Sequence, residues 1–274
     1  MTRPAANTGT VLDNIIDGVI EDMAARKAST PLARMQERAA EVSPARDAYA
    51  ALVGGRQNPS GVEIIAEVKR ASPSAGPLAN IASPAELAAQ YAAGGAAAIS
   101  VLTEQRRFNG SLADFDAVRA QVDVPLLRKD FTVDEYQIYE ARAHDADLVL
   151  LIVAALDDAQ LRDYLALTHE LGMNALVETH TVEEIERAAA VDASIVGVNV
   201  RNLKTLEVDT AHYGTLADQL PEHVVRVAES GVKTAADVAN YAAQGADAVL
   251  VGEALVKHGT PQQAVTDFRH ASRP

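Results

Sequence analysis

The chain has 274 residues, 48% of them hydrophobic, which suits one large α/β domain or two smaller ones. Its formal net charge of −14 argues against a general nucleic-acid or membrane-surface binder, because both partners are polyanions. Cysteine is absent, which excludes disulfides, a thiol nucleophile and cysteine-based zinc sites and fits a cytoplasmic protein. No stretch is apolar for long enough to span a membrane, and acidic residues interrupt the first apolar segment, so we expect no export signal.

Residues 1–60 form an extension ahead of the first predicted strand. Its apolar residues fall at helical spacing: Val11, Leu12, Ile15, Ile16, Val19, Ile20 and Met23. Such a helix could cap one end of the following domain or form a dimer face, and the cap is the favoured interpretation. We expect the segment 30–62 to be irregular, with "NPSG" at 58–61 as the turn into that domain.

Eight short apolar runs follow, and helical patterns lie between most of them. The runs are "EIIAEV" near 64, "AAAISVL" near 97, "VPLLR" near 124, "ADLVLLIV" near 147, "MNALVE" near 173, "SIVGVNV" near 195, "VVRVAES" near 224 and "ADAVLVG" near 247. Several helices begin with Ser or Thr ahead of an acidic residue, as Thr181 stands ahead of Glu184. Short, fully apolar strands are typical of a buried parallel sheet.

This repeat of strand and helix predicts a (β/α)8 TIM barrel over residues 61–274, with the extension packed on it as part of one domain. The alternative is a doubly wound sheet. Such a sheet usually has fewer strands and a glycine-rich nucleotide loop, and neither a GxGxxG nor a Walker pattern is present.

Polar residues follow most of the predicted strands. In a TIM barrel the active site lies at the C-terminal ends of the strands, so these side chains would share one cavity. They are Glu67, Lys69, Thr103, Glu104, Lys129, Asp130, Glu178, Asn199, Arg201, Glu229 and Ser230. A single charged residue after a strand is usually a solvated loop residue. The convergence of so many favours an active site, although Glu104 and Asp130 could merely orient a neighbouring cation.

Glycine follows the last two strands, at Gly231 in "AESGV" and Gly252 in "VGEAL". Either glycine could simply permit a tight turn, but the pair suits backbone binding of a phosphate, which TIM barrels often hold after strands 7 and 8. The seven histidines show no metal-binding spacing, so we expect no metal site and expect most of them at the surface.

These motifs resemble the indole-3-glycerol phosphate synthase family of tryptophan biosynthesis. The matching blocks span residues 10–265 in the family's order: "IIAEVKRASPSAG", "ISVLTEQRRFNGS", "PLLRKDF", "LVETH", "VGVNVRNLKTLEVD", "AESGV" and "VGEAL". The segment "VLDNIIDGVIEDMAARK" resembles the family's helical extension, which helps to cover the active site. One departure is Ala75, where many members carry Lys.

The resemblance implies a carboxy-lyase that needs no cofactor. An enzyme of this family converts 1-(2-carboxyphenylamino)-1-deoxyribulose 5-phosphate into indole-3-glycerol phosphate, with loss of carbon dioxide and water. The resemblance assigns Lys129 as the acid at the carbonyl oxygen during ring closure. Glu178 and Lys69 are the candidates for acid and base in the dehydration, and either could take either role.

The resemblance also implies residues that hold the substrate. Glu67 and Asn199 would position its hydroxyl and carboxylate, and Phe108 and Phe131 would wall the aromatic ring. The residues expected around the anionic groups are Ser72, Ser230, Gly231, Gly252 and Glu253, with Arg201 in support. The side chain of Glu253 would repel an anion, so its backbone is expected to bind.

Two other functions compete with this interpretation. The isomerase that acts on phosphoribosyl anthranilate would need a Cys/Asp pair, and cysteine is absent. A catalytically silent scaffold would have lost Lys129 or Glu178, and both are present. The expected partner is therefore a phosphorylated small molecule, bound by a monomer or weak homodimer.

Overall fold

The computed structural model describes residues 11–57, 62–73, 76–78, 81–202, 207–257 and 260–271, and its eight parallel strands form a closed barrel. The barrel order is β1, β10, β9, β8, β7, β6, β5, β4. The strands are β1 (Glu63–Val68), β4 (Ala98–Leu102), β5 (Leu126–Lys129), β6 (Leu148–Ile152), β7 (Asn174–Thr179), β8 (Ile195–Asn199), β9 (Val225–Glu229) and β10 (Ala248–Val251). They match the eight apolar runs in turn, so the predicted TIM barrel is confirmed.

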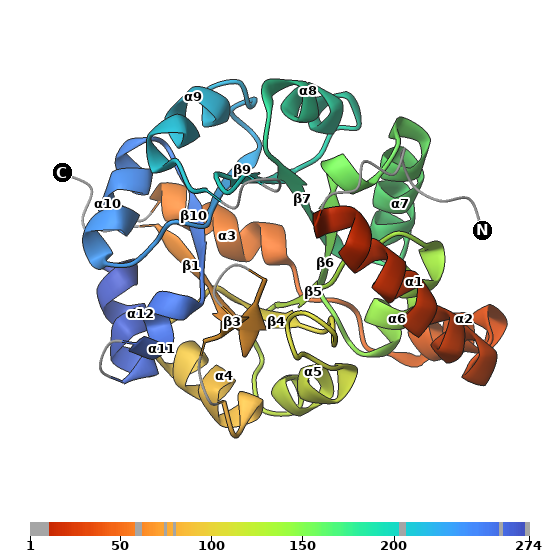
Figure 1. Cartoon of the computed structure of the whole chain (residues 1–274). Helices are drawn as coiled ribbons and strands as arrows, with labels where there is room; N and C mark the ends of the chain where they lie inside the picture. The colour runs from red at the N-terminus through yellow and green to blue at the C-terminus, as the bar shows by residue number, and fades with distance from the viewer. Residues whose placement is uncertain are drawn as a thin grey trace.

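Helices surround the barrel as an outer ring (Figure 1). They are α4 (Pro84–Ala93), α5 (Leu112–Arg119), α6 (Glu135–Ala143), α7 (Asp158–Glu170), α8 (Val182–Ala190), α9 (Tyr213–Ala217), α10 (Ala235–Ala243), α11 (Glu253–Lys257) and α12 (Pro261–Arg269). Thr181 begins α8 as predicted, because its side chain accepts a hydrogen bond from the backbone N–H of Glu184. The apolar faces of these helices pack on the outward side chains of the strands in one continuous core.

Three helices precede the barrel: α1 (Val11–Ser29), α2 (Leu32–Glu41) and α3 (Ala48–Gln57). The expectation that 30–62 is irregular was therefore wrong for the part that α2 and α3 occupy. Apart from alanines, the apolar residues of helix α2 are Leu32 and Met35. Met35 and Ala39 are buried and α2 packs on α6, so tertiary contacts stabilise it. The predicted turn at 58–61 lies outside the described residues.

The interior of the barrel is a second apolar core, which the extension closes at both ends. Leu12, Ile15, Ile16 and Val19 of α1 share this core with Leu150 of β6 and other inward side chains. Ala48 and Leu52 of α3 belong to the same core, and the backbone N–H of Ala48 donates to the side chain of Asn174 at the start of β7. Helix α3 thus covers the N-terminal ends of the strands, whereas α1 covers the C-terminal ends.

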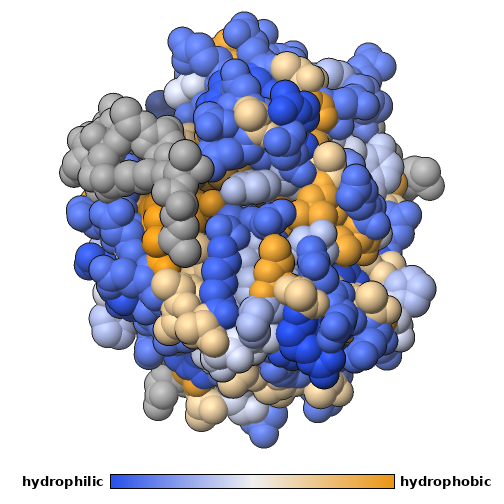
Figure 2. Space-filling model, turned by 90° about the vertical axis from the view of Figure 1, so that its right-hand side faces the viewer, coloured by the Kyte–Doolittle hydropathy of each residue, from blue (hydrophilic) through white to orange (hydrophobic). Residues whose placement is uncertain are grey.

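A short hairpin follows β1, formed by β2 (Ala71–Ser72) and β3 (Gly76–Pro77). Arg70, just before it, pairs with Asp114 at the start of α5 and so ties this loop to the next βα unit. Hydrophilic residues cover most of the face shown in Figure 2, with smaller apolar areas between them. Among the described residues, no helix is both long enough and apolar enough to cross a membrane.

Candidate active site

A cavity of about 210 Å³ opens at the C-terminal ends of the strands. Val11, Leu12 and Ile15 of α1 contribute to its wall. All of the residues expected to act on or hold the substrate line it: Glu67, Lys69, Ser72, Phe108, Phe131, Lys129, Glu178, Asn199, Arg201, Ser230, Gly231, Gly252 and Glu253. Of the other polar residues at strand ends, Asp130 and Glu229 also line the cavity, whereas Thr103 and Glu104 do not, so the expectation was wrong for those two. The barrel therefore brings together side chains that stand up to 186 positions apart in the sequence, from Glu67 to Glu253.

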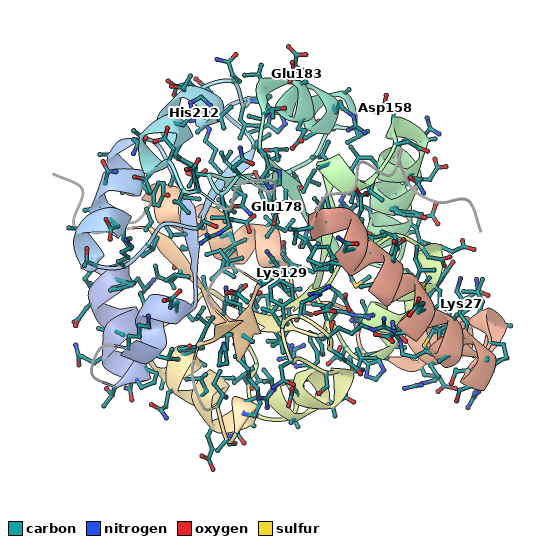
Figure 3. All side chains as sticks on the ribbon, viewed as in Figure 1. Lys27, Lys129, Asp158, Glu178, Glu183 and His212 are labelled. Atoms are coloured by element: carbon teal, nitrogen blue, oxygen red, sulfur yellow. The ribbon has the colours of Figure 1, made fainter. Side chains whose placement is uncertain are left out.

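Lys129 lies between two buried carboxylates. Its Nζ is 3.2 Å from Glu178 Oε2 and 3.1 Å from Glu229 Oε2, and Figure 3 shows Lys129 and Glu178 near the middle of the barrel. Burial alone would lower the pKa of Lys129, but the two carboxylates outweigh burial and raise it. The lysine is therefore an ammonium ion at neutral pH and can donate a proton.

The two carboxylates differ in charge because they share one ammonium group. Burial opposes ionisation of Glu178, yet Lys129 and His180 lower its pKa and keep it ionised. Burial raises the pKa of Glu229 to about 8, and the charge of Glu178 adds to this shift against the opposing effect of Lys129. The site thus combines an ionised carboxylate, a lysine cation and a carboxyl group that retains its proton near neutral pH.

Glu67 and Lys69 form a second ion pair, at the end of β1. Glu67 is buried, and Ser100 Oγ lies 3.5 Å from its Oε2. Although burial would raise the pKa of Glu67, Lys69 and Lys129 lower it, so this carboxylate is also ionised. A Cβ placed on Gly252 would lie 3.1 Å from Glu67 Cβ, so the close approach of β1 to the loop after β10 favours glycine there.

Asn199 links Glu178 to the loop after β9. Its Nδ2 donates to Glu178 Oε1 at 3.2 Å, and its Oδ1 accepts from Ser230 Oγ at 2.8 Å and from the backbone N–H of Arg201 at 3.1 Å. Ser230 has a φ of 73°, a left-handed conformation that is uncommon outside glycine. This backbone turn aims Ser230 at Asn199, and Gly231 follows it with a φ of 79°.

An apolar wall faces these polar groups. The rings of Phe108 and Phe131 lie 6.0 Å apart between centroids, and Leu150 and Ile152 of β6 line the same cavity. Glu104 holds the loop that carries Phe108, since its carboxylate accepts hydrogen bonds from three successive backbone N–H groups, those of residues 106–108. Glu104, one of the two acids whose role the sequence left open, therefore orients a loop backbone.

Asp130, the other ambiguous acid, lines the cavity and is buried in a polar network. Its Oδ2 accepts from Thr103 Oγ1 at 2.6 Å and from Arg128 Nη2 at 3.1 Å, and its Oδ1 accepts from the backbone N–H of Phe131 at 2.8 Å. Asp130 therefore orients Arg128 and the loop that bears Phe131.

Gly231, Val232, Gly252 and Glu253 form another part of the cavity wall. The carboxylate of Glu253 pairs with Lys257, one turn further along α11. This pair draws the carboxylate of Glu253 toward Lys257 on its own helix. Among the described residues, no group of three or more His, Asp or Glu side chains could hold a metal ion.

Sequence reasoning left two residues of this region without a role. Glu229 was expected to face the cavity, as it does, but its contact with Lys129 was not foreseen. His180 was grouped with surface histidines, yet its side chain is only 10% exposed and its Nε2 lies 3.3 Å from Glu178 Oε1. Its place two residues after Glu178 was the available signal, because side chains at i and i+2 of a strand point to the same side.

Comparisons with known proteins show the family to which the chain belongs. Residues 12–268 match the family model described as indole-3-glycerol phosphate synthase. The chain is 65% identical over 262 residues to a protein of that name from Paenarthrobacter aurescens, with 96% of both chains covered. It is 66% identical over 262 residues to another from Micrococcus luteus, with 96% of this chain and 98% of the relative covered.

A solved structure gives an independent comparison of the fold. The structure of 3-hexulose-6-phosphate synthase from Salmonella typhimurium superposes with a TM-score of 0.63 at 13% identity, covering 77% of this chain and 98% of that one. At this identity the likeness concerns the barrel alone. The identities of 65% and 66% over nearly the whole length are far higher than this 13%. Together with the family model, they show that the chain belongs to the indole-3-glycerol phosphate synthase family.

Proposed function

We propose that this protein converts 1-(2-carboxyphenylamino)-1-deoxyribulose 5-phosphate into indole-3-glycerol phosphate, carbon dioxide and water. The observation that carries the proposal is the placement of Lys129 Nζ within 3.2 Å of both Glu178 and Glu229, beside an aromatic wall in one cavity. An acid, an ionised carboxylate and an apolar surface are the groups that this reaction needs.

The two ends of the substrate fit different parts of the cavity. The benzoate ring would lie against Phe108 and Phe131, where apolar surroundings disfavour the charged carboxylate relative to neutral carbon dioxide. The sugar phosphate would lie at the backbone of Gly231 and Gly252, with Ser72, Ser230 and Glu253 nearby. Lys69 and Arg201 supply positive charge in a protein whose net charge is −14.

Ring closure forms the new carbon–carbon bond. The ring carbon that bears the carboxylate attacks the ribulose carbonyl carbon, and the electron pair of the C=O bond moves to oxygen. Lys129 donates its proton to that oxygen, which becomes a hydroxyl. The carboxylates of Glu178 and Glu229 support this role by holding the ammonium group in the cavity, where the charge that develops on the substrate oxygen can draw its proton away.

Decarboxylation and dehydration complete the indole. The carbon–carboxylate bond breaks, carbon dioxide leaves, and its electron pair restores the aromatic ring. The new hydroxyl then departs as water after it gains a proton. A base removes one proton from the CH2 group beside the nitrogen, and the electron pair of that C–H bond forms the new double bond of the five-membered ring. Glu178 and Lys69 are the groups for this step, while Glu67 and Asn199 hold the substrate in place.

The proposed setting of the enzyme is the cytoplasm, supported by the absence of cysteine. We also propose that it works as a monomer or weak homodimer. The burial of Leu12, Ile15 and Ile16 against the chain's own barrel supports this, because those side chains are not available for a partner. The proposed reaction uses no metal or redox cofactor, so turnover should persist in EDTA.

A direct assay tests the function. The purified protein is mixed with the carboxyphenylamino-deoxyribulose phosphate, and the rise of indole fluorescence is followed together with released carbon dioxide. Equal amounts of both products, unaffected by EDTA, are expected. An absence of both products would overturn the proposal, whereas turnover of phosphoribosyl anthranilate instead would favour the isomerase.

A further inference from the structure

His180 stands at the end of β7 between two carboxylates on different elements. Its Nε2 lies 3.3 Å from Glu178 Oε1, and its Nδ1 lies 3.1 Å from Glu184 Oε2 on α8. The Glu184 carboxylate also accepts the backbone N–H of His180 at 2.7 Å, so the ring and its own backbone share one acceptor. The backbone contact restricts the rotation of Glu184 and holds it against the imidazole.

The imidazole does not line the catalytic cavity. It lines a neighbouring groove, whose other charged or titratable groups are Glu184, Arg201, Glu207, Asp209 and His212. Nε2 is buried, and no well-aligned acceptor completes a hydrogen bond to it among the residues that the structure describes. The carboxylate nearest to it is Glu178, so a small rotation of either side chain would complete that bond.

The flanking charges favour a protonated ring. Burial alone would lower the pKa of His180, but Glu178 and Glu184 outweigh burial and raise it to about 10. A doubly protonated imidazolium can donate from both nitrogens, one to each carboxylate, whereas a neutral imidazole can donate from only one. The series Glu184, His180, Glu178, Lys129 therefore alternates in charge from α8 into the catalytic cavity.

We propose that His180 is a positioning residue of this active site, whose imidazolium, held by Glu184, orients Glu178 and keeps its carboxylate ionised. The inference rests on the proposed function, in which Glu178 takes part in the dehydration. Lys129 contacts Oε2 of Glu178, while Asn199 and His180 lie at Oε1. Without His180, the carboxylate can turn about its last bond and loses one of two neighbouring cations.

The first test is an NMR titration of the histidine ring in the free protein, which does not depend on turnover. The His180 signal is identified by its absence from the His180→Gln spectrum and should titrate near pH 10. Glu178→Gln and Glu184→Gln should each lower that pKa, because each removes a negative charge beside the ring. Titration near 6.5, or no response to Glu178→Gln, would overturn the contact.

The second test is the dependence of kcat on pH. His180→Gln should lower kcat by roughly tenfold, which corresponds to the loss of an interaction with Glu178 equivalent to about one pKa unit. KM should not change, because the ring does not touch the substrate. In Glu184→Gln, kcat should fall on the alkaline side at the pH where the NMR signal of His180 titrates. The double variant His180→Gln/Glu184→Gln should lack this fall in kcat on the alkaline side.

His144 provides a matched control. Its Nδ1 pairs with Asp116 at 2.6 Å on the outer helices, away from the cavity, so His144→Gln removes a similar contact without touching Glu178. Its kcat and pH profile should match those of the unaltered protein. A His180→Gln protein with the same kcat and profile would overturn the positioning role, even if the NMR titration shows the ion pairs. Failure of the unaltered protein to form product would instead count against the proposed function.

Discussion

Gly197 on β8 leaves the space that the Glu229 side chain on β9 occupies. A Cβ at position 197 would lie 2.0 Å from Glu229 Oε1, which is far inside contact distance. The glycine thus determines where a carboxyl group meets Lys129.

Gly197→Ala should displace Glu229 from Lys129. We expect a loss of stability of about 1–3 kcal/mol from overpacking, together with lower kcat. Urea unfolding and steady-state kinetics measure both. Gly54→Ala on α3 is the control, since its Cβ would find only an ordinary contact at 3.6 Å from Glu63 Oε1. Unchanged stability and turnover in Gly197→Ala would contradict this account.

Lys129→Ala should abolish ring closure and leave the barrel folded. The variant lacks the proton donor, so ring closure should stop. It should still fold, because Glu229 already favours its neutral form and would not place a second negative charge beside Glu178. Single-turnover assays and circular dichroism would test this.

Lys27→Met is the control. It removes an ion pair with Asp134 outside the cavity and should lower the free energy of unfolding by at most about 1 kcal/mol, with normal turnover. The two lysines are well separated in Figure 3. Near-normal turnover by Lys129→Ala would remove the proposed acid.

Glu229 should make stability depend on pH. Its pKa is raised from an ordinary value of 4.5 to about 8 in the folded protein. Between these values the folded state binds more protons than the unfolded state, so this group's contribution to stability falls as pH rises. Glu229→Gln removes the effect.

The unfolding free energy of Glu229→Gln minus that of the unaltered protein should therefore grow from pH 5 to pH 8. It should level off above the folded-state pKa of about 8. Urea unfolding at several pH values measures this difference. Glu37→Gln, at an exposed pair with Arg34, should give a flat difference. A difference for Glu229→Gln that does not vary with pH would rule out the raised pKa.

Arg106 joins the loop that carries Phe108 to the extension. Its guanidinium contacts Glu21 at 2.8 Å and Asp22 at 2.7 Å, both on α1. Arg106→Ala should raise KM more than it lowers kcat, because it loosens two walls of the cavity without removing a reacting group. It should also speed hydrogen exchange in α1. Arg34→Ala, which breaks an exposed pair within α2, should change neither, and an unaltered KM in Arg106→Ala would count against the link.

The sequence predicted the barrel because buried parallel strands are apolar without interruption, as in "LVLLI" of β6. It also predicted which residues meet, because the C-terminal strand ends of a TIM barrel converge. Helices α2 and α3 were not predicted. Leu32 and Met35 are the only apolar residues of α2 besides alanine, and two glycines follow the apolar run of α3, so contacts with the rest of the chain stabilise both helices. For His180, the spacing from Glu178 indicated the side to which the ring points. The spacing did not indicate its contact with Glu184, which depends on a hydrogen bond from the His180 backbone to that carboxylate.

The barrel closes by pairing its first strand with its last, Ala66 opposite Val251. Glu67 therefore meets Gly252, which follows it by 185 positions in the sequence. While the polypeptide is still on the ribosome, the pocket has an open seam beside Glu67 and Lys69. The barrel closes only when β10 has docked against β1, so we expect a nascent chain that lacks β10 to be inactive.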